Sequence, residues 1–570
     1  MLAAAMALAG VLLLYWGRDQ TFFADDWVYI IYYRDWDPET LLYPANGHLV
    51  VLPLLLFKTV LAAVGADSFA PFRVMALAFV LVNAMLLYLL ARRRLGPELA
   101  LAPAVLMLFL GSAWEVIGAS FSLTVLTSTA AGLGMLLCLD RGDMRGDAGA
   151  CVLLALSLAS FSLGVVFALI AAAEILQRDG GERLRRSWVV LGPVALYAVW
   201  FLWALKYDQS TLDAANIGAA PAAVADAAAA VSAAIFGVFR TPGAEVPGSP
   251  DLSISLDWGT PIALVLAALL VLRLRYGPRP SPRAWALLGA LVLYWALLAL
   301  SISEARAPNS SRYLYAGTLL VLLLAIELAA GMRIGRGWRL AVAAVLAVSL
   351  VANVDTIRVA GGFFREEAEY NRSQLAALEL VRDEAPPDLP VEEQTGSLLP
   401  HGDLYFGAFQ YFDAIDEFGS PAYSAAELAE AGPPQRAAAD RLLGRALRLR
   451  AEPVRSPPAP ERAARGSEGT VVAVGPARHM EVSRRQGCVV LRPDLGREGL
   501  AALRLPPGGF AYRAGPRAEV DLRLGRFGDG FAVEPAQVLG SAVVRIPRDD
   551  SSRPWRALLA AADPFEACPL

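Results

Sequence analysis

Two adjacent carboxylates stand near the start of the chain, just after its first apolar stretch. Asp25 and Asp26 lie in the segment Phe-Phe-Ala-Asp-Asp-Trp, a few residues beyond the apolar run 2–16. Neighbouring carboxylates repel each other, and the repulsion grows where the dielectric constant is low. Such a pair can bind a cation, hold a hydroxyl group or accept a proton. Alternatively, it starts a solvated loop and caps a short helix.

Other polar residues stand at the ends of later apolar runs. Arg73 begins one run, and Arg312 with Tyr313 begins another. The planar donors of an arginine at this depth suit a lipid phosphate, although arginine and tyrosine also serve there as interfacial anchors. Glu115 lies in a short loop and His48 precedes a helical stretch. Each is a candidate for chemistry, with a loop cap and a plain helix start as the alternatives.

Two tryptophans accompany these groups. Trp27 follows the acidic pair and Trp114 precedes Glu115. Either could pack on the apolar face of a sugar ring, although tryptophan at a membrane interface is usually an anchor. The sequence contains no Walker loop, no GxSxG elbow and no HExxH, and its three histidines are scattered. We therefore predict no dedicated metal site and no nucleotide site.

The composition indicates a membrane protein. Of 570 residues, 56% are hydrophobic, and the mean hydropathy is +0.47, which is too apolar for a soluble globule. A net charge of -4 favours no nucleic-acid partner. The N-terminus lacks a basic region and a cleavage site, so we interpret residues 2–16 as an uncleaved first helix.

Apolar runs dominate the chain up to residue 357. Those suited to a bilayer, some of them short, are 2–16, 72–91, 99–112, 123–139, 188–205, 257–274, 284–302, 313–331 and 339–357. Residues 149–176 form one longer run, interrupted by Ser160–Gly164, which we interpret as two short helices joined by a turn. The total is about eleven membrane helices.

Arginine clusters predict the orientation of these helices, because cytoplasmic loops are enriched in basic residues. If residues 48–64 do not cross the membrane, every basic loop faces the cytoplasm. We therefore interpret 48–64 as a juxtamembrane helix on the outer face, with the N-terminus of the chain inside and its C-terminus outside. The clusters are Arg92–Arg94, Arg141 and Arg145, Arg178–Arg186, Arg273–Arg283 and Arg333–Arg339.

The rest of the chain is predicted to be an extracytoplasmic α+β region. Residues 358–468 contain helical patterns at 365–385 and 424–448 and a proline- and arginine-rich linker at 451–468. Residues 469–570 alternate in the manner of a small β-sandwich. Cys488 and Cys568 fall in this part, where an oxidising compartment would permit a disulfide. The expected strands are 470–474, 488–491, 518–524, 530–533 and 541–546.

This layout resembles the GT-C superfamily of polyprenyl-phosphate-dependent glycosyltransferases, which includes protein O-mannosyltransferases and aminoarabinose transferases. The resemblance covers residues 1–357 and rests on Asp25-Asp26 after the first helix, Asn46-Gly47-His48 through Pro53, Gly65 with Arg73, and Arg312-Tyr313. The chain departs from the commoner His-Pro-Pro motif, because Pro53 does not directly follow His48.

The resemblance implies a function and roles for the candidate residues. The chain would be a bacterial inner-membrane glycosyltransferase that moves a sugar from a polyprenyl-phosphate donor to an extracytoplasmic glycan, lipid or protein. Asp25 or Asp26 would be the base, with Glu115 beside them, and Arg73, Arg312 and Tyr313 would hold the donor phosphate. No cofactor is required, although a divalent cation could bind at Asp25 and Asp26.

Two other classes of function remain open. A transporter or flippase of a lipid-linked sugar would carry ionisable residues at mid-membrane and paired broken helices. Here charges are nearly absent from the centres of the runs, and only the Ser160–Gly164 break favours transport. The third class is a non-catalytic wall-binding scaffold, in which the sandwich would be the working part.

Overall fold

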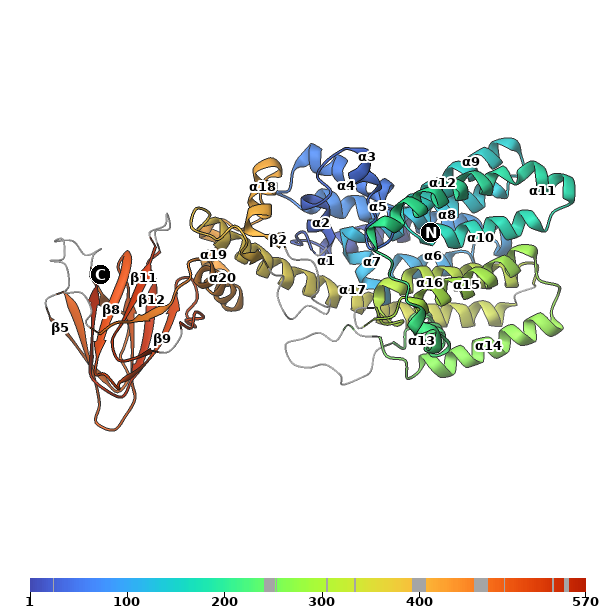
Figure 1. The fold of residues 1–570 in the computed structure, drawn as a ribbon. Helices are drawn as coiled ribbons and strands as arrows, with labels where there is room; N and C mark the ends of the chain where they lie inside the picture. The colour runs from blue at the N-terminus through green and yellow to red at the C-terminus, as the bar shows by residue number, and fades with distance from the viewer. Residues whose placement is uncertain are drawn as a thin grey trace. The chain divides into compact units, whose positions relative to one another are not determined.

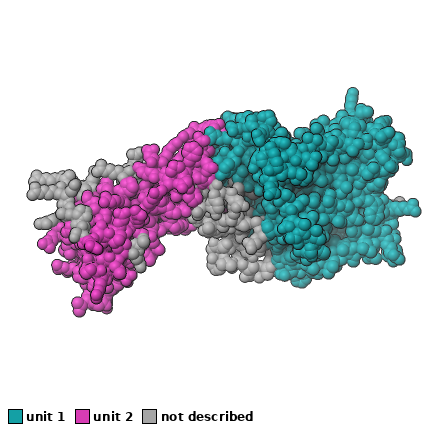
Figure 2. Space-filling view, viewed as in Figure 1, with its two compact units in different colours: residues 1–365, 398–400 teal, residues 366–397, 401–570 magenta. Residues whose placement is uncertain are grey.

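The computed structural model describes residues 1–23, 25–239, 252, 254–303, 306–332, 335–391, 406–455, 470–485, 487–535, 538–547 and 553–570. Residues 456–468 of the predicted linker lie outside these ranges. The chain divides into two compact units, shown in Figure 2. Unit 1 comprises residues 1–365 and 398–400, and unit 2 comprises 366–397 and 401–570.

Unit 1 is helical. Its helices are α1 (Leu2–Trp16), α2 (Asp25–Ile31), α3 (Pro38–Leu42), α4 (Val51–Val64), α5 (Ala70–Leu95), α6 (Leu101–Leu108), α7 (Trp114–Gly118), α8 (Leu123–Leu139), α9 (Met144–Leu158), α10 (Leu163–Leu176), α11 (Gly180–Arg186), α12 (Trp188–Ala204), α13 (Ala220–Phe236), α14 (Gly259–Tyr276), α15 (Pro282–Leu300), α16 (Ser311–Ala329) and the first part of α17 (Arg336–Glu379). Each predicted membrane run overlaps at least one of these helices; the run 99–112 extends past α6, and the run 149–176 covers parts of α9 and α10. In Figure 1, α9, α12, α10 and α15 run roughly side by side.

By length and composition, seven stretches of the described helices could cross a membrane. They are Ala70–Leu95, Leu101–Gly118, Trp188–Tyr207, Gly259–Tyr276, Pro282–Leu300, Ser311–Ala329 and the apolar part of Arg336–Glu379. Shorter apolar helices include α1, α4, α8, α10 and α13. Large apolar side chains remain exposed on several of these helices, such as Leu196, Leu264 and Val351. Such exposure is expected where lipid rather than water surrounds the helix. The prediction of a polytopic helical protein is confirmed.

One end of the bundle is held together by ion pairs. Asp140 contacts Arg283 at 2.7 Å and also pairs with Arg93 and Arg94. Arg283 also reaches Glu174 at 2.8 Å, and Arg94 reaches Glu327 at 2.9 Å. These groups come from the C-terminal ends of α5, α8, α10 and α16 and from the start of α15. We call this the ionic end; it brings together residues that the sequence assigns to cytoplasmic loops.

A turn separates α9 and α10 at the predicted interruption; it occupies residues 159–162, and Gly164 already lies in the first turn of α10. A Cβ on Gly164 would lie 2.5 Å from the backbone nitrogen of Leu158, so the close approach of the two helices requires glycine. The alanine-rich helix of unit 1 is α13. It packs on α14, α15 and α16, with small residues such as Ala230 and Ala234 fully buried.

Unit 2 combines helices with two sheets. It holds the last turns of α17, then α18 (Ala408–Phe418), α19 (Ala425–Glu430) and α20 (Pro433–Ala446), and a strand pair β1 (Pro390–Val391) and β2 (Phe406–Gly407). The sheets have the orders β10-β9-β12-β7-β4 and β3-β11-β8-β13-β6-β5 (Figure 1). Their strands are β3 (Ala451–Pro453), β4 (Val472–Ala473), β5 (Met480–Arg485), β6 (Cys488–Pro493), β7 (Gly499–Arg504), β8 (Gly508–Ala514), β9 (Glu519–Gly525), β10 (Val538–Leu539), β11 (Ala542–Ile546), β12 (Arg556–Ala561) and β13 (Phe565–Pro569).

Two elements that the sequence predicts in unit 2 were wrong. The 424–448 pattern is two helices, α19 and α20, because Gly432 with the following prolines starts a new helix. Residues 530–533 form no strand, and only Val533 bridges to Leu524. The sheets also recruit β3, upstream of residue 469, which pairs with β11. At residue 357, where the membrane part was predicted to end, α17 continues without a break.

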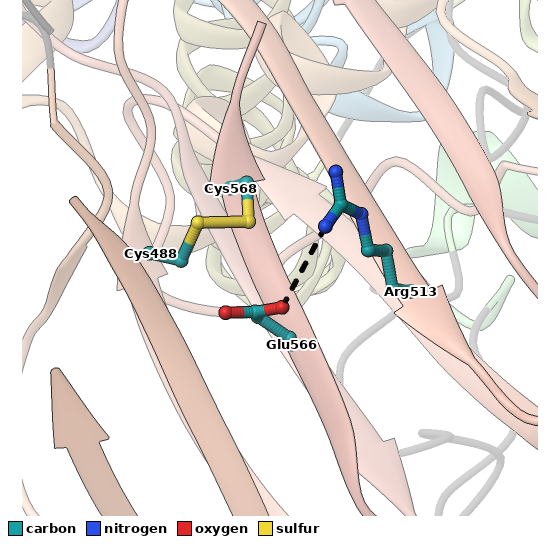
Figure 3. The surroundings of a disulfide bond; sticks show 4 residues. All are labelled: Cys488, Arg513, Glu566 and Cys568. Atoms are coloured by element: carbon teal, nitrogen blue, oxygen red, sulfur yellow. Dashed lines mark ion pairs between the residues drawn. A yellow bond between two sulfur atoms is a disulfide. The ribbon is translucent and has the colours of Figure 1, made fainter. Parts of the chain in front are cut away.

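A disulfide joins the two cysteines of the sandwich (Figure 3). Cys488 begins β6 and Cys568 lies near the end of β13, and these strands are antiparallel neighbours. Glu566 lies two residues before Cys568 on β13 and pairs with Arg513 on β8, with a carboxylate oxygen 4.0 Å from a guanidinium nitrogen. Both cysteines are buried. The bond ties the C-terminal strand to the sheet, and it confirms the pairing that the sequence left open.

Candidate active site

A cavity of about 580 Å³ opens in unit 1 at the end of the helices opposite the ionic end. It is lined by the starts of α8, α10 and α16, by the ends of α12 and α15, and by α2 and the residues before α4. Its volume lies within the roughly 300–1,000 Å³ typical of ligand pockets. Polar groups on its wall include Asp25, His48, Arg306 and Arg312, and most of the remaining lining is aliphatic or aromatic.

The helix α2 places Asp25 in this wall. Before the helix, the fully buried ring of Phe22 makes edge-to-face contacts with Phe69 and Phe72, with centroids 5.4 and 5.1 Å away. Beyond it, the ammonium group of Lys58 on α4 donates to the backbone carbonyls of Tyr33, Arg34 and Asp35. The two anchors hold α2 at both ends, so the position of Asp25 is set by packing rather than by a free loop.

The carboxylate of Asp25 lies close to two cationic groups. Burial raises the pKa of Asp25 above its usual 3.8, and the charges of Arg312 and Arg306 oppose this shift without cancelling it. A carboxylate with a raised pKa is a stronger base when it is ionised. Asp25 therefore combines access to the cavity with the proton affinity of a general base.

Asp26 is placed quite differently from its neighbour. Its side chain is fully buried and does not line the cavity. One oxygen accepts from the backbone N–H of Phe23 at 3.1 Å, and the other accepts from the hydroxyl of Ser120. The side chain of Asp26 therefore links the start of α2 to the segment before α8 through hydrogen bonds. The sequence could not separate the two aspartates, whereas the structure places only Asp25 on the cavity.

Arg312 and Glu115 form an ion pair beside the cavity. The Nε atom of Arg312 lies 3.1 Å from a carboxylate oxygen of Glu115. Glu115 is buried and does not line the cavity, whereas Arg312 does. The pair uses the Nε–H of the guanidinium group, so the terminal nitrogens can donate to other partners. Tyr313 also lines the cavity, and its backbone carbonyl accepts from the hydroxyl of Tyr294 at 2.9 Å.

Arg306 is a further cationic residue at the cavity, and it was not among the phosphate-binding residues predicted from the sequence. It lies in the connection between α15 and α16, lines the cavity and is half-buried. Its charge acts on both Asp25 and His48. Within the described ranges, no carboxylate forms an ion pair with it. Its position in a short loop before Arg312 was the available signal, since paired arginines commonly mark an anion site.

Arg73, predicted to bind a phosphate, does not reach the cavity. Its guanidinium group donates to the carbonyl oxygens of Ile117 and Gly118 at the end of α7 and to that of Leu13 at the end of α1. Helix C-termini present unsatisfied carbonyl groups with a partial negative charge. Arg73 therefore caps two helices, and this need for a buried cation explains an arginine at the start of a membrane helix.

The two tryptophans are also buried in the protein rather than facing the cavity. Trp27 packs edge-on against Phe22, with ring centroids 5.8 Å apart. Trp114 packs against Phe363 and Phe364 on α17, at 5.7 and 5.5 Å. Neither lines the cavity, so their placement gives no support to stacking on a sugar. Aromatic residues that do line it include Tyr197 and Trp200, both of which the sequence analysis passed over.

His48 lies on the cavity wall, as its candidacy requires. Asn46 and Gly47 both have positive φ angles, of 50° and 78°, and the backbones of Ala45 and His48 exchange two hydrogen bonds. This is the pattern of a type I′ turn, for which Asn-Gly is the preferred sequence. The turn presents the imidazole, whose Nδ1 lies 2.6 Å from the hydroxyl oxygen of Ser162.

The donor set near Asp25 does not fit a divalent cation well. Asp26 already accepts two hydrogen bonds, Glu115 is paired with Arg312, and Arg306 and Arg312 place positive charge beside Asp25. Calcium and magnesium require several converging oxygen ligands. In the described part of the chain, the only place where ligand atoms of three His, Cys, Asp or Glu residues converge involves Cys488, Glu566 and Cys568. The disulfide consumes both of those thiols.

No protein-family model and no curated protein matches the chain. Solved structures that resemble it include ArnT from Cupriavidus metallidurans in the apo state, with 13% identity over 75% of this chain and 90% of that protein, at a TM-score of 0.39. ArnT from the same organism bound to undecaprenyl phosphate matches with 15% identity over 76% and 88%, at a TM-score of 0.35. At these scores the likeness carries no weight for function.

Proposed function

We propose that the chain is a GT-C-type glycosyltransferase that moves a sugar from a polyprenyl-phosphate donor onto an acceptor hydroxyl. The observation that carries this proposal is the meeting of Asp25, Arg306 and Arg312 on one cavity between apolar membrane helices. A base and two cations are the groups that transfer from a lipid phosphate requires. The apolar part of the lining, including Val165, Val194 and Leu297, suits isoprene units.

The proposed reaction assigns one step to each group. Asp25 removes the proton of the acceptor hydroxyl as its oxygen attacks the anomeric carbon of the sugar. The bond between that carbon and the phosphate oxygen breaks, and the polyprenyl phosphate leaves with the bonding electrons. Arg306 and Arg312 stabilise the charge that grows on the phosphate, while Glu115 orients Arg312 through their ion pair. An inverting reaction needs no further group.

The compartment and the substrates belong to the same proposal. The protein would lie in a bacterial inner membrane, with the cavity and unit 2 on the outer side. The arginine clusters and the disulfide support this orientation, because basic loops face the cytoplasm and disulfides persist outside it. The donor sugar is a hexose or pentose, and the acceptor is a cell-wall glycan, a lipid or a protein.

A genetic experiment with matched variants tests the assignment. Deletion of the gene should cause a polyprenyl-linked sugar to accumulate, as measured by mass spectrometry of extracted lipids. The wild-type gene and an Asp19→Asn control, altered at an exposed site on the neighbouring segment, should clear it. Asp25→Asn should not, since loss of a general base costs about 10²–10⁴ in rate. Clearance by the Asp25→Asn variant at a normal rate would refute the proposed base.

Transport of a lipid-linked sugar is the rival that this experiment must separate. A transporter needs a pathway open to each side in turn, whereas the end opposite the cavity is crossed by the ion pairs of Asp140, Arg283 and Glu174. Purified protein in vesicles distinguishes the two functions. A transferase consumes the donor lipid and releases polyprenyl phosphate when an acceptor is present; a flippase moves the donor across the bilayer and leaves it intact.

Metal dependence is tested on the same purified protein. Because the donor set around Asp25 includes two arginines and one uncommitted carboxylate, we propose that transfer proceeds without a divalent cation. Activity should survive EDTA treatment and should not rise when Mg²⁺, Mn²⁺ or Ca²⁺ is restored. Loss of activity in EDTA with recovery on adding one of these ions would instead place a cation at Asp25.

A further inference from the structure

Three polar side chains from separate segments meet on one wall of the cavity. They are His48 from the turn before α4, Ser162 from the turn between α9 and α10, and Tyr197 from α12. The Nδ1 atom of His48 lies 2.6 Å from the Ser162 hydroxyl oxygen, which lies 3.4 Å from the hydroxyl oxygen of Tyr197. We call these residues the hydroxyl triad. The proposed transfer reaction gives none of them a role.

The hydroxyl triad is held in place before any ligand arrives. The type I′ turn fixes the backbone of His48, and the ring of Phe161 packs on the imidazole, with centroids 4.2 Å apart. Ser162 lies in the tight turn that Gly164 permits. Tyr197 packs against Trp200, whose indole N–H donates to the carbonyl of Leu42 at 2.8 Å. A ligand therefore meets groups that lose little conformational freedom on binding.

The chemistry of the hydroxyl triad matches that of a neutral sugar. Serine and tyrosine hydroxyls and a neutral imidazole each offer both a donor and an acceptor. Their mutual contacts occupy only part of that capacity, and all three groups line the cavity. Sugar hydroxyls likewise donate and accept at the same atom. The triad can thus exchange hydrogen bonds with neighbouring hydroxyls on one ring without a net charge on either side.

The local charge disfavours a cationic ligand at this wall. Burial and the positive charge of Arg306 lower the pKa of His48 to about 4, so its imidazole is neutral at physiological pH. Burial, and to a lesser degree the charge of Arg306, disfavour a proton on His48, and both disfavour an ammonium group at the same place. A sugar that carries a free amine would lose hydration here and would face the charge of Arg306.

From this arrangement, we infer that His48, Ser162 and Tyr197 form a subsite for the hydroxyl groups of an uncharged sugar on the donor lipid. The inference rests on the proposed function and deepens it by naming a substrate class. The subsite selects hexoses or pentoses with free hydroxyls over amino sugars. Arg306 and Arg312 bind the phosphate independently of it, so the two contributions to affinity can be measured separately.

The test measures binding of defined lipids to the purified full-length chain in nanodiscs. The probes are undecaprenyl phosphate alone, its glucose, mannose and arabinose conjugates, and an amino-sugar counterpart of each. We expect at least one neutral conjugate to bind about tenfold more tightly than both undecaprenyl phosphate and its own amino counterpart, which corresponds to one or two net hydrogen bonds. If no neutral conjugate shows this gain, the subsite does not exist as proposed.

Variants then show which side chains produce the gain in affinity that the neutral sugar provides. Ser162→Ala and Tyr197→Phe should each remove most of the tenfold gain and leave the affinity for undecaprenyl phosphate within about twofold of wild type. Tyr207→Phe is the matched control, because the Tyr207 hydroxyl bonds to Glu39 and Tyr207 does not line the cavity. Equal weakening of all lipids by the triad variants, or an equal effect of Tyr207→Phe, would overturn the inference.

The design separates failure of the inference from failure of the proposed function. If wild-type protein binds undecaprenyl phosphate but gains nothing from a sugar, the subsite is refuted and the phosphate site stands. If undecaprenyl phosphate itself does not bind, both are overturned. His48→Gln provides a further check, because glutamine keeps a neutral donor and acceptor. It should retain more of the gain than His48→Ala, whereas equal loss in the two would contradict a hydrogen-bonding role.

Discussion

At the scale of single residues, Asp25 carries a carboxylate in surroundings that disfavour its charge. Its pKa is raised by burial and is held back only in part by Arg312 and Arg306. Asp26, beside it, is committed to Phe23 and Ser120. One backbone step thus separates a group that can exchange protons with a ligand from one that supports the fold. The distinction comes from which face of α2 each side chain occupies.

The raised pKa of Asp25 predicts opposite trends for stability and activity. The folded protein binds the Asp25 proton more tightly than the unfolded chain does, so its contribution to stability is complete below about pH 3.8. That contribution is lost as the pH rises through the raised value. Asp25→Asn should therefore be more stable than wild type at neutral pH while losing transfer activity. Thermal unfolding in detergent across the pH range measures the first effect, and a rate assay measures the second.

The pH dependence of the transfer rate also shows which protonation state of Asp25 is active. The transfer rate of wild type should fall as the pH drops through the raised pKa, because only the ionised carboxylate accepts a proton. Asp19→Asn should change neither profile. A less stable Asp25→Asn protein would show that Asp25 supports the fold rather than the reaction.

At the scale of elements, short segments between membrane helices carry the site. The Asn46–Gly47 turn, the turn between α9 and α10 and the α15–α16 connection each present one polar side chain or a pair to the cavity. Their backbones are constrained by close approaches: a Cβ on Gly47 would lie 2.7 Å from the carbonyl oxygen of Gln209. Rigid turns hold functional groups more accurately than free loops do.

Gly47→Ala should therefore disturb the site through its turn. The substitution combines a positive φ of 78° with a backbone clash, and a left-handed conformation alone costs about 1–2 kcal/mol for alanine. Gly142→Ala is a control, because Gly142 also has a positive φ, of 69°, and open space around it. Both variants should lose stability, Gly47→Ala more so, and only Gly47→Ala should weaken the binding of sugar lipids. Equal binding by the two would show that the turn does not position His48.

The disulfide is a second local feature that constrains the chain. It closes a loop with a sequence separation of 80 residues, for which loop-closure entropy predicts about 4–5 kcal/mol as an upper value. Replacing Cys488 and Cys568 by alanine should lower the unfolding temperature of unit 2. A reducing agent should lower it in wild type but not in the variant. Alanine at Cys138 and Cys151, which are free thiols, should have little effect. A reductant-resistant transition in wild type would contradict a stabilising role.

At the scale of the whole molecule, unit 1 separates two kinds of polar chemistry along its helices. The ionic end joins α5, α8, α10, α15 and α16 through Asp140, Arg94 and Arg283. The other ends of α8, α10, α15 and α16 line the cavity. Between the two lie apolar segments whose outer faces expose leucine and valine. This arrangement suits a protein whose two ends meet different aqueous compartments.

Topology mapping tests the orientation directly. Single cysteines would replace the exposed residues Asp19 and Glu98 in a chain lacking the free thiols Cys138 and Cys151. A membrane-impermeant maleimide should label Asp19→Cys in cells whose outer membrane has been permeabilised. It should label Glu98→Cys only after lysis, because Glu98 follows the arginine cluster that ends α5. Labelling of Glu98→Cys in intact cells would invert the proposed topology and exclude an extracytoplasmic site.

Sequence alone determined the membrane helices of unit 1. Apolar run length predicts the membrane helices, because a lipid core tolerates no unsatisfied backbone groups. The Ser160–Gly164 interruption predicts a turn, and the positions of arginine group the helix ends correctly. Strands such as β7, β12 and β13 escaped detection, since their pairing depends on partners distant in sequence. The types of Asp25, His48 and Arg312 and their positions near the ends of apolar runs were also enough to propose them as site residues.

Only the tertiary structure decided which of the candidate residues line the same cavity. Residue type does not reveal whether an arginine meets the carbonyl groups of two helix ends, as Arg73 does, or a cavity, as Arg306 and Arg312 do. Nor does it distinguish Asp25 from Asp26. These outcomes depend on how helices remote in sequence pack, because packing determines which polar groups find protein partners and which remain available to a ligand.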